Sequence, residues 1–112
     1  MESSLLIFEQ DLAEAVYAAQ PAAEYTAGVL AAAMREGHRG PVFLQADHDQ
    51  VNATNYAKDP AKETERFSNV IREQIAASFF NIDVDASTVV DLAPPTLVEQ
   101  QRENAELTAK FT

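Results

Sequence analysis

The stretch VFLQADH, residues 42–48, decides the fold of this chain. Side chains alternate between the two faces of a β-strand, so Leu44 and Ala46 lie on one apolar face. Gln45 and Asp47 lie on the opposite face, which becomes polar toward the end of the strand. One face is therefore suited to packing under helices, and the other is suited to a polar site.

The segment Asn81–Ala86 divides its faces in the same way. Asp83 and Asp85 share one face, and Ile82 and Val84 share the other. A doubly wound parallel sheet normally buries apolar residues on both faces. One apolar face and one face that is polar at the strand ends are instead typical of a barrel, with helices outside and the active site in the carboxyl-terminal mouth.

Helical segments separate the expected strands, the first of which is Leu5–Gln10. Pro21 opens a helix, as its missing N–H allows in a first turn, and Gly37 supplies a left-handed cap. Asp59, followed by a proline, caps a second helix, and Thr96 begins a capping box for a third. The apolar face expected for the second helix consists of Phe67, Val70, Ile71, Ile75 and Phe79. Three strand–helix pairs in succession predict an α/β fold with parallel strands.

A complete (β/α)8 barrel takes about 250 residues, whereas this sequence has 112. We therefore expect residues 1–112 to be a fragment of a TIM barrel domain, with about three consecutive βα units. Such a fragment leaves two sheet edges open and one acidic face uncovered. We expect the isolated chain to be marginally stable, prone to aggregation or assembled as a homo-oligomer.

Composition narrows the classes of partner. The net charge of -10 argues against nucleic acid, whose phosphates this chain repels. Apolar runs are shorter than the ~20 residues of a membrane span, and the start lacks the basic residues of a signal peptide. The absence of cysteine fits a cytoplasmic location. A sugar phosphate needs local cations, but the basic residues from Lys58 to Arg72 are interspersed with glutamates, and the sequence shows no basic stripe.

Asp47 and His48 end the second expected strand, where barrel enzymes place catalytic groups. An imidazole can bind zinc, and an adjacent carboxylate can transfer protons. An Asp-His pair alone is more often structural, but Asp83 and Asp85 are expected at the same barrel mouth. Glu9, on the first strand, can also point into it. Several carboxylates in one place are costly without partners, which favours a functional site.

Two motifs resemble those of the class II, metal-dependent ketose-bisphosphate aldolases. The sequence QADH at 45–48 resembles the family's His-x-Asp-His strand motif. The sequence FNIDVDAS at 80–87 resembles its next strand motif, which ends in four positions: a hydrophobic residue, Asp, either Gly or Ala, and Ser. The intervening AASF at 76–79 resembles the family's Ala-x-x-Gly-Phe approach to that strand, without the glycine. Gln45 stands where the family has its first histidine. The resemblance covers roughly residues 40 to 92.

The resemblance implies roles for individual residues. Asp47 matches the catalytic aspartate, which exchanges a proton with the substrate hydroxyl, and His48 matches a ligand of the catalytic zinc. The residues expected to border the metal and substrate pocket are Gln45, Asp83, Asp85 and Ser87. The implied reaction is cleavage of fructose- or tagatose-1,6-bisphosphate to dihydroxyacetone phosphate and an aldehyde, a carbon–carbon lyase reaction of carbohydrate metabolism. The family's other zinc ligands come from later strands.

Two alternatives remain open at this point. Asp47 and His48, followed by Asn52, also resemble the Asp-His-Leu-Gly-Pro-Asn segment of the non-catalytic subunits of tagatose-bisphosphate aldolases. Those subunits are barrels of the same type that support a catalytic partner. A truncated product without activity is the third interpretation. The sequence does not distinguish the two ketose bisphosphates.

Overall fold

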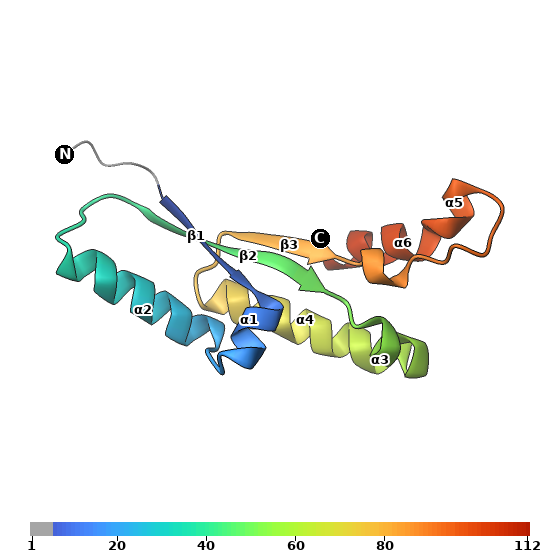
Figure 1. Cartoon of the computed structure of the whole chain (residues 1–112), viewed down its shortest axis with the longest axis horizontal. Coiled ribbons are helices and arrows are strands. Elements are labelled where there is room, and N and C mark those ends of the chain that lie inside the picture. The colour runs from blue at the N-terminus through green and yellow to red at the C-terminus, as the bar shows by residue number, and fades with distance from the viewer. Residues whose placement is uncertain (1–5) are drawn as a thin grey trace. The chain divides into compact units, whose positions relative to one another are not determined.

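The computed structural model describes residues 6–112, so Leu5, the expected start of the first strand, lies outside the described residues. The elements in chain order are β1 (Leu6–Asp11), α1 (Leu12–Tyr17), α2 (Ala22–Arg35), β2 (Val42–Gln50), α3 (Ala53–Lys58), α4 (Pro60–Ala76), β3 (Asn81–Asp85), η1 (Ser87–Val89), α5 (Leu97–Gln100) and α6 (Arg102–Phe111). The strands form one sheet in the order β1-β2-β3, and all run in the same direction (Figure 1). The predicted α/β class with parallel strands is confirmed. Within the described residues, no helix has the length and apolar character needed to cross a bilayer.

The chain divides into two compact units. The first consists of Met1–Asp47 and Ile71–Asp83, and the second of His48–Val70 and Val84–Thr112. The first unit holds β1, α1, α2 and the greater part of β2 and β3. The second holds α3, η1, α5, α6 and most of α4. Each unit has buried residues of its own.

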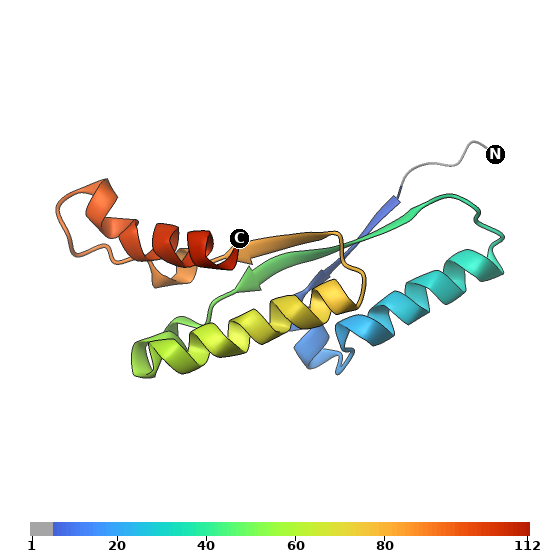
Figure 2. The same cartoon turned by 180° about the vertical axis from the view of Figure 1, so that it is seen from behind.

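The core of the first unit lies between the sheet and α2. Leu44 and Ala46 of β2 are buried there together with Ala77 and Phe79, which precede β3. The partly buried residues packed against this cluster are Phe8, Ala22, Tyr25, Val29 and Ile82. Helix α2 lies along this face of β1 and β2 (Figures 1 and 2). The prediction that helices cover the face of Leu44 and Ile82 is confirmed.

The opposite face of the sheet is built in layers. At the start of the strands Phe43 and Phe80 meet edge to face, with ring centroids 5.8 Å apart. In the next layer Gln45 donates a hydrogen bond to Glu9 at 3.0 Å and accepts one from Asn81 at 3.4 Å. The register then pairs Asp11 with Asp47 at the carboxyl ends. This face therefore changes from apolar to acidic along the strands.

Local signals explain where the first helices begin and end. Pro21 precedes α2 as its N-cap residue, and Gly37 follows it with a φ of 70°, a conformation that favours glycine. Both were predicted. Helix α1 was not predicted. It begins after Asp11, whose side chain accepts from the N–H of Ala13 while Glu14 accepts from the N–H of Asp11. A capping box thus turns the end of β1 directly into a helix.

The second unit is organised around Phe67 of α4, whose side chain is fully buried. The centroid of its ring lies 4.8 Å from the ring centroid of Phe111 in α6. The expected apolar face of this helix is partly wrong, because Ile75 is 60% exposed while Gln74 is buried. Helix α3 was also missed, and Asn52 caps it by accepting from the N–H of Asn55.

The last predicted helix begins as expected but is divided in two. Thr96 caps α5 by accepting from the N–H of Glu99. Gln101 then separates α5 from α6. Tyr56 of α3 donates a hydrogen bond to Glu103 of α6, which raises the pKa of the phenol to about 12. This hydrogen bond links α6 to α3 within the second unit.

A matched pair of leucine variants tests the one-sided burial of the sheet. Leu44 is 3% exposed and Leu30 is 45% exposed. We expect Leu44→Ala to lower the free energy of unfolding by about 2–5 kcal/mol, since it leaves a cavity in the core. Leu30→Ala removes the same atoms and should cost less than half as much. Urea unfolding of both variants measures the difference, and equal losses would contradict this packing.

Candidate metal centre

His48 changes the course of β2 near its carboxyl end. Its φ is 49°, in the left-handed region that few non-glycine residues adopt but histidine enters more often than most. Leu44 and Ala46 are buried, and regular alternation would bury residue 48 next. Instead His48 is exposed and Asp49 is fully buried. The left-handed residue thus keeps the imidazole out of the helix-covered face.

Asp47 and Asp83 come together at the carboxyl ends of β2 and β3, in the first unit. Each offers a carboxylate oxygen, and these oxygens lie within 4.8 Å of one another. Asp47 is half-buried and Asp83 is exposed. Two carboxylates this close repel each other, and a cation bound between them would offset that repulsion. The pair is therefore a natural position for a cation.

His48 follows Asp47 directly, so its Cα lies ~3.8 Å from that of Asp47. Two carboxylate oxygens and one imidazole nitrogen form a donor set that zinc and related divalent metals use. The residues present thus fit a divalent metal by their chemistry.

Gln45 is a predicted pocket residue with a different set of partners. Its amide joins Glu9 and Asn81 in one layer across the three strands. Glutamine is not a usual zinc ligand, whereas the histidine expected here from the resemblance would be. Glu9 faces the same side, as expected, and is engaged by Gln45. This layer of hydrogen-bonded side chains precedes the acidic carboxyl ends of the strands.

Asp85 and Ser87, the other predicted pocket residues, belong to the second unit. Asp85 accepts hydrogen bonds from the side chain of Gln50 at 2.9 Å and from the N–H of Ser87 at 2.9 Å. Burial acts to raise the pKa of the Asp85 carboxyl, but hydrogen bonds from Ser87 and Gln50, with a smaller effect of His48, hold that pKa below its ordinary value. Asp85 is therefore a fixed anion at the end of β3.

A buried ionic cluster was not predicted from the sequence. Asp49 is fully buried, and Glu63 of α4 is 2% exposed. Arg66 donates to both oxygens of Glu63, at 2.9 and 2.6 Å, and the N–H of Asn52 donates at 2.9 Å. The hydrogen bonds from Arg66 and Asn52 lower the pKa of Glu63 despite its burial. Regular alternation beyond Asp47 would place residue 49 on the face of Asp47, and the left-handed His48 accounts for its burial instead.

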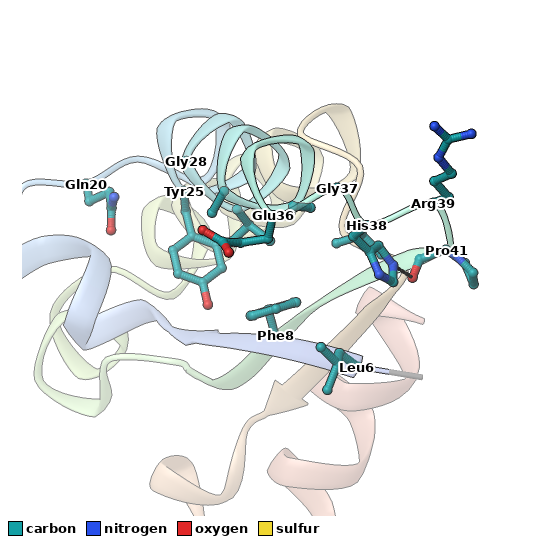
Figure 3. A pocket seen from close by; sticks show the side chains of 14 residues that line it. Leu6, Phe8, Gln20, Tyr25, Gly28, Glu36, Gly37, His38, Arg39 and Pro41 are labelled. Carbon is teal, nitrogen blue, oxygen red and sulfur yellow. Dashed lines mark hydrogen bonds between the residues drawn. The ribbon is translucent and has the colours of Figure 1, made fainter. Parts of the chain in front are cut away.

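A separate cleft of about 820 Å³ lies between α2 and the first half of β1, on the helix-covered side (Figure 3). Phe8 of β1 and Tyr25 of α2 face each other across it, and Tyr25 donates a hydrogen bond to the carbonyl of Glu9 at 2.7 Å. Small residues of α2, including Gly28, form much of its wall. The cleft thus leaves part of the apolar surface of α2 uncovered.

The pKa of Asp85 provides a test of the network at the end of β3. Ser87→Ala removes the hydroxyl donor, so we expect the pKa of Asp85 in an NMR titration to rise toward its ordinary value. Because the folded pKa is depressed, these bonds stabilise the chain above the unfolded pKa, and this contribution is lost as the pH falls through the folded pKa. Stability in Ser87→Ala should therefore fall less on acidification. Ser68→Ala, which removes a hydroxyl bonded within α4, is the control. An unchanged pKa of Asp85 in Ser87→Ala would contradict the assignment.

Comparison with known proteins identifies no relative of this chain. No family model matches the sequence, and neither a curated protein nor a solved structure matches it. Any assignment of function therefore depends on the residues and their geometry.

Proposed function

We propose that this chain supplies three βα units of a (β/α)8 barrel and that the complete barrel is a class II, metal-dependent ketose-bisphosphate aldolase. The observation that supports this most strongly is the meeting of Asp47 and Asp83 at the carboxyl ends of parallel strands, with His48 next in the chain. Barrel enzymes place their chemistry at this end of the strands. The proposed reaction is retro-aldol cleavage to dihydroxyacetone phosphate and an aldehyde.

The layered face of the sheet supports the barrel. The interior of a TIM barrel is filled by successive layers of side chains from its strands. Here an aromatic layer of Phe43 and Phe80 is followed by the layer of Glu9, Gln45 and Asn81. The cleft beside α2 supports it as well, since the helix of a further βα unit, pairing its strand with the open edge of β1, would cover that apolar surface.

In the proposed enzyme, His48 and Asp83 would hold the metal, together with ligands from later strands. When bound, the metal would polarise the ketose carbonyl and stabilise the negative charge that develops there. Asp47 would move the proton of the substrate hydroxyl at the cleaved bond, with one carboxylate oxygen as the base. Asp85, whose carboxylate accepts hydrogen bonds from Ser87 and Gln50, would be a permanent negative charge at the end of β3.

A non-catalytic barrel subunit is the second candidate, and Gln45 is the residue that favours it. The position that the aldolase motif gives to a zinc-binding histidine is occupied here by an amide engaged with two neighbouring strands. In such a subunit the same residues would stabilise the barrel without metal chemistry. The two candidates make different predictions for variants of Asp47 and His48.

We predict different failures for two variants of the protein that carries the complete barrel. Asp47→Asn keeps the shape of the side chain but cannot exchange the proton, so cleavage should fall by ~10²–10⁴-fold while zinc stays bound. His48→Ala removes a ligand, so both zinc content and cleavage should fall severely. Zinc content by atomic absorption and the rate of dihydroxyacetone phosphate release measure the two effects.

The 112-residue chain alone, which lacks the later strands of the proposed barrel, is the control. It should bind zinc no better than a surface histidine with nearby carboxylates, and it should not cleave substrate. Wild-type turnover in Asp47→Asn would reject this role for the aspartate. The non-catalytic subunit would then become the leading candidate.

A further inference from the structure

A second concave site lies in the second unit, where α3 ends and α4 begins. It has a volume of about 340 Å³, at the small end of the range of ligand pockets. The residues that line it are Asn55, Lys58, Asp59, Lys62, Glu63 and Arg66. Three of the eight cationic side chains of an acidic protein thus border one small pocket.

Spacing along the chain explains why these cations gather. Lys62 and Arg66 are four residues apart in α4 and so lie on one side of consecutive turns of that helix. Lys58 ends α3 and Lys62 lies in the first turn of α4, so the junction at Asp59 forms the pocket between them. Of the two glutamates in this stretch, Glu63 is bound by Arg66, and Glu65 does not line the pocket.

The two acidic residues of the pocket each have internal partners. Asp59 accepts a hydrogen bond from the N–H of Lys62 at 3.1 Å and thereby caps α4. Glu63 is bound by Arg66 and by the N–H of Asn52. Within residues 6–112, neither Lys58 nor Lys62 forms an ion pair through its ammonium group. The lining thus holds three cationic side chains against two carboxylates, and one of those carboxylates is already paired with Arg66.

We propose that this pocket binds a single phosphate group, as inorganic phosphate or as a small phosphate monoester. Lys58 and Lys62 supply the charge, and Arg66 adds a guanidinium already oriented by Glu63. Charge-assisted hydrogen bonds of this kind are the strong ones in anion recognition. The net charge of -10 argues against a long polyanion such as nucleic acid, whose phosphates beyond the pocket would meet an acidic chain.

This site is independent of the proposed aldolase activity. It requires no metal, and none of its residues belongs to the candidate metal centre. Phosphate binding can therefore be present in a protein that lacks aldolase activity, and it can be absent from one that has it.

Isothermal titration of the chain with inorganic phosphate, in a buffer without other polyvalent anions, tests the proposal. The variant Lys58→Gln with Lys62→Gln should bind phosphate at least about tenfold more weakly than the wild type, since it loses two charge-assisted donors. The matched control, Arg39→Gln with Lys110→Gln, loses the same charge at two exposed positions outside the pocket and should bind within about twofold of the wild type.

Circular dichroism establishes that each variant is folded, and Lys58→Arg with Lys62→Arg, which retains both charges, should keep most of the affinity. An equal loss of phosphate affinity in the glutamine variant and in the matched control would overturn the proposal, because the loss would then follow from the change in net charge alone. Failure of the folded wild type to bind phosphate at tens of millimolar would overturn it as well.

Discussion

Strand β2 buries only one of its two faces, and this constraint organises the first unit. Leu44 and Ala46 are covered by α2 and by the residues that precede β3. The parallel pairing of β1 with β2 then fixes which residues lie on the other face, because paired residues of neighbouring strands point to the same side of the sheet. A slip of one residue would move Gln45 and Asp47 into the core and would bring Leu44 to the surface.

The uncovered face concentrates carboxylates at the carboxyl ends of the strands. Charge repulsion between groups such as Asp47 and Asp83 is unfavourable, and a bound cation is one way to offset it. His48 adds a second cost, since a left-handed conformation outside glycine costs of order 1–3 kcal/mol. Unfavourable local structure of both kinds at one strand end is typical of a functional site. The carboxylates and the left-handed His48 therefore make this strand end the candidate site of the first unit and its neighbouring residue.

Alternation and capping residues were sufficient to predict the strands, their parallel order and the starts of α2, α4 and α5. Pro21, Gly37 and Thr96 act locally, so the sequence alone reveals them. The short helices α1 and α3 were missed because they contain only 6 residues each and depend on capping by Asp11 and Asn52 rather than on an apolar repeat.

Features that depend on tertiary structure were beyond prediction. The burial of Asp49 follows from the left-handed His48, which no pattern of residues announces. The cations at 58, 62 and 66 looked neutralised in the sequence, since Asp59, Glu63 and Glu65 stand between them. Only the folded chain engages Glu63 with Arg66 and leaves two lysines at a pocket. Three-dimensional pairing, rather than sequence spacing, decides which charges remain available.

The most direct test of the proposed metal centre is diffraction at the zinc absorption edge from crystals of the complete barrel protein soaked with zinc. We predict an anomalous peak within about 2.0–2.2 Å of an imidazole nitrogen of His48 and of a carboxylate oxygen of Asp83. The same electron-density map should show Asp47 beside the peak. It should also show further strands that enclose the sheet face bearing Gln45. Zinc bound elsewhere, or a layer of helices packed on the face of Gln45 and Asp47, would contradict both the metal centre and the barrel.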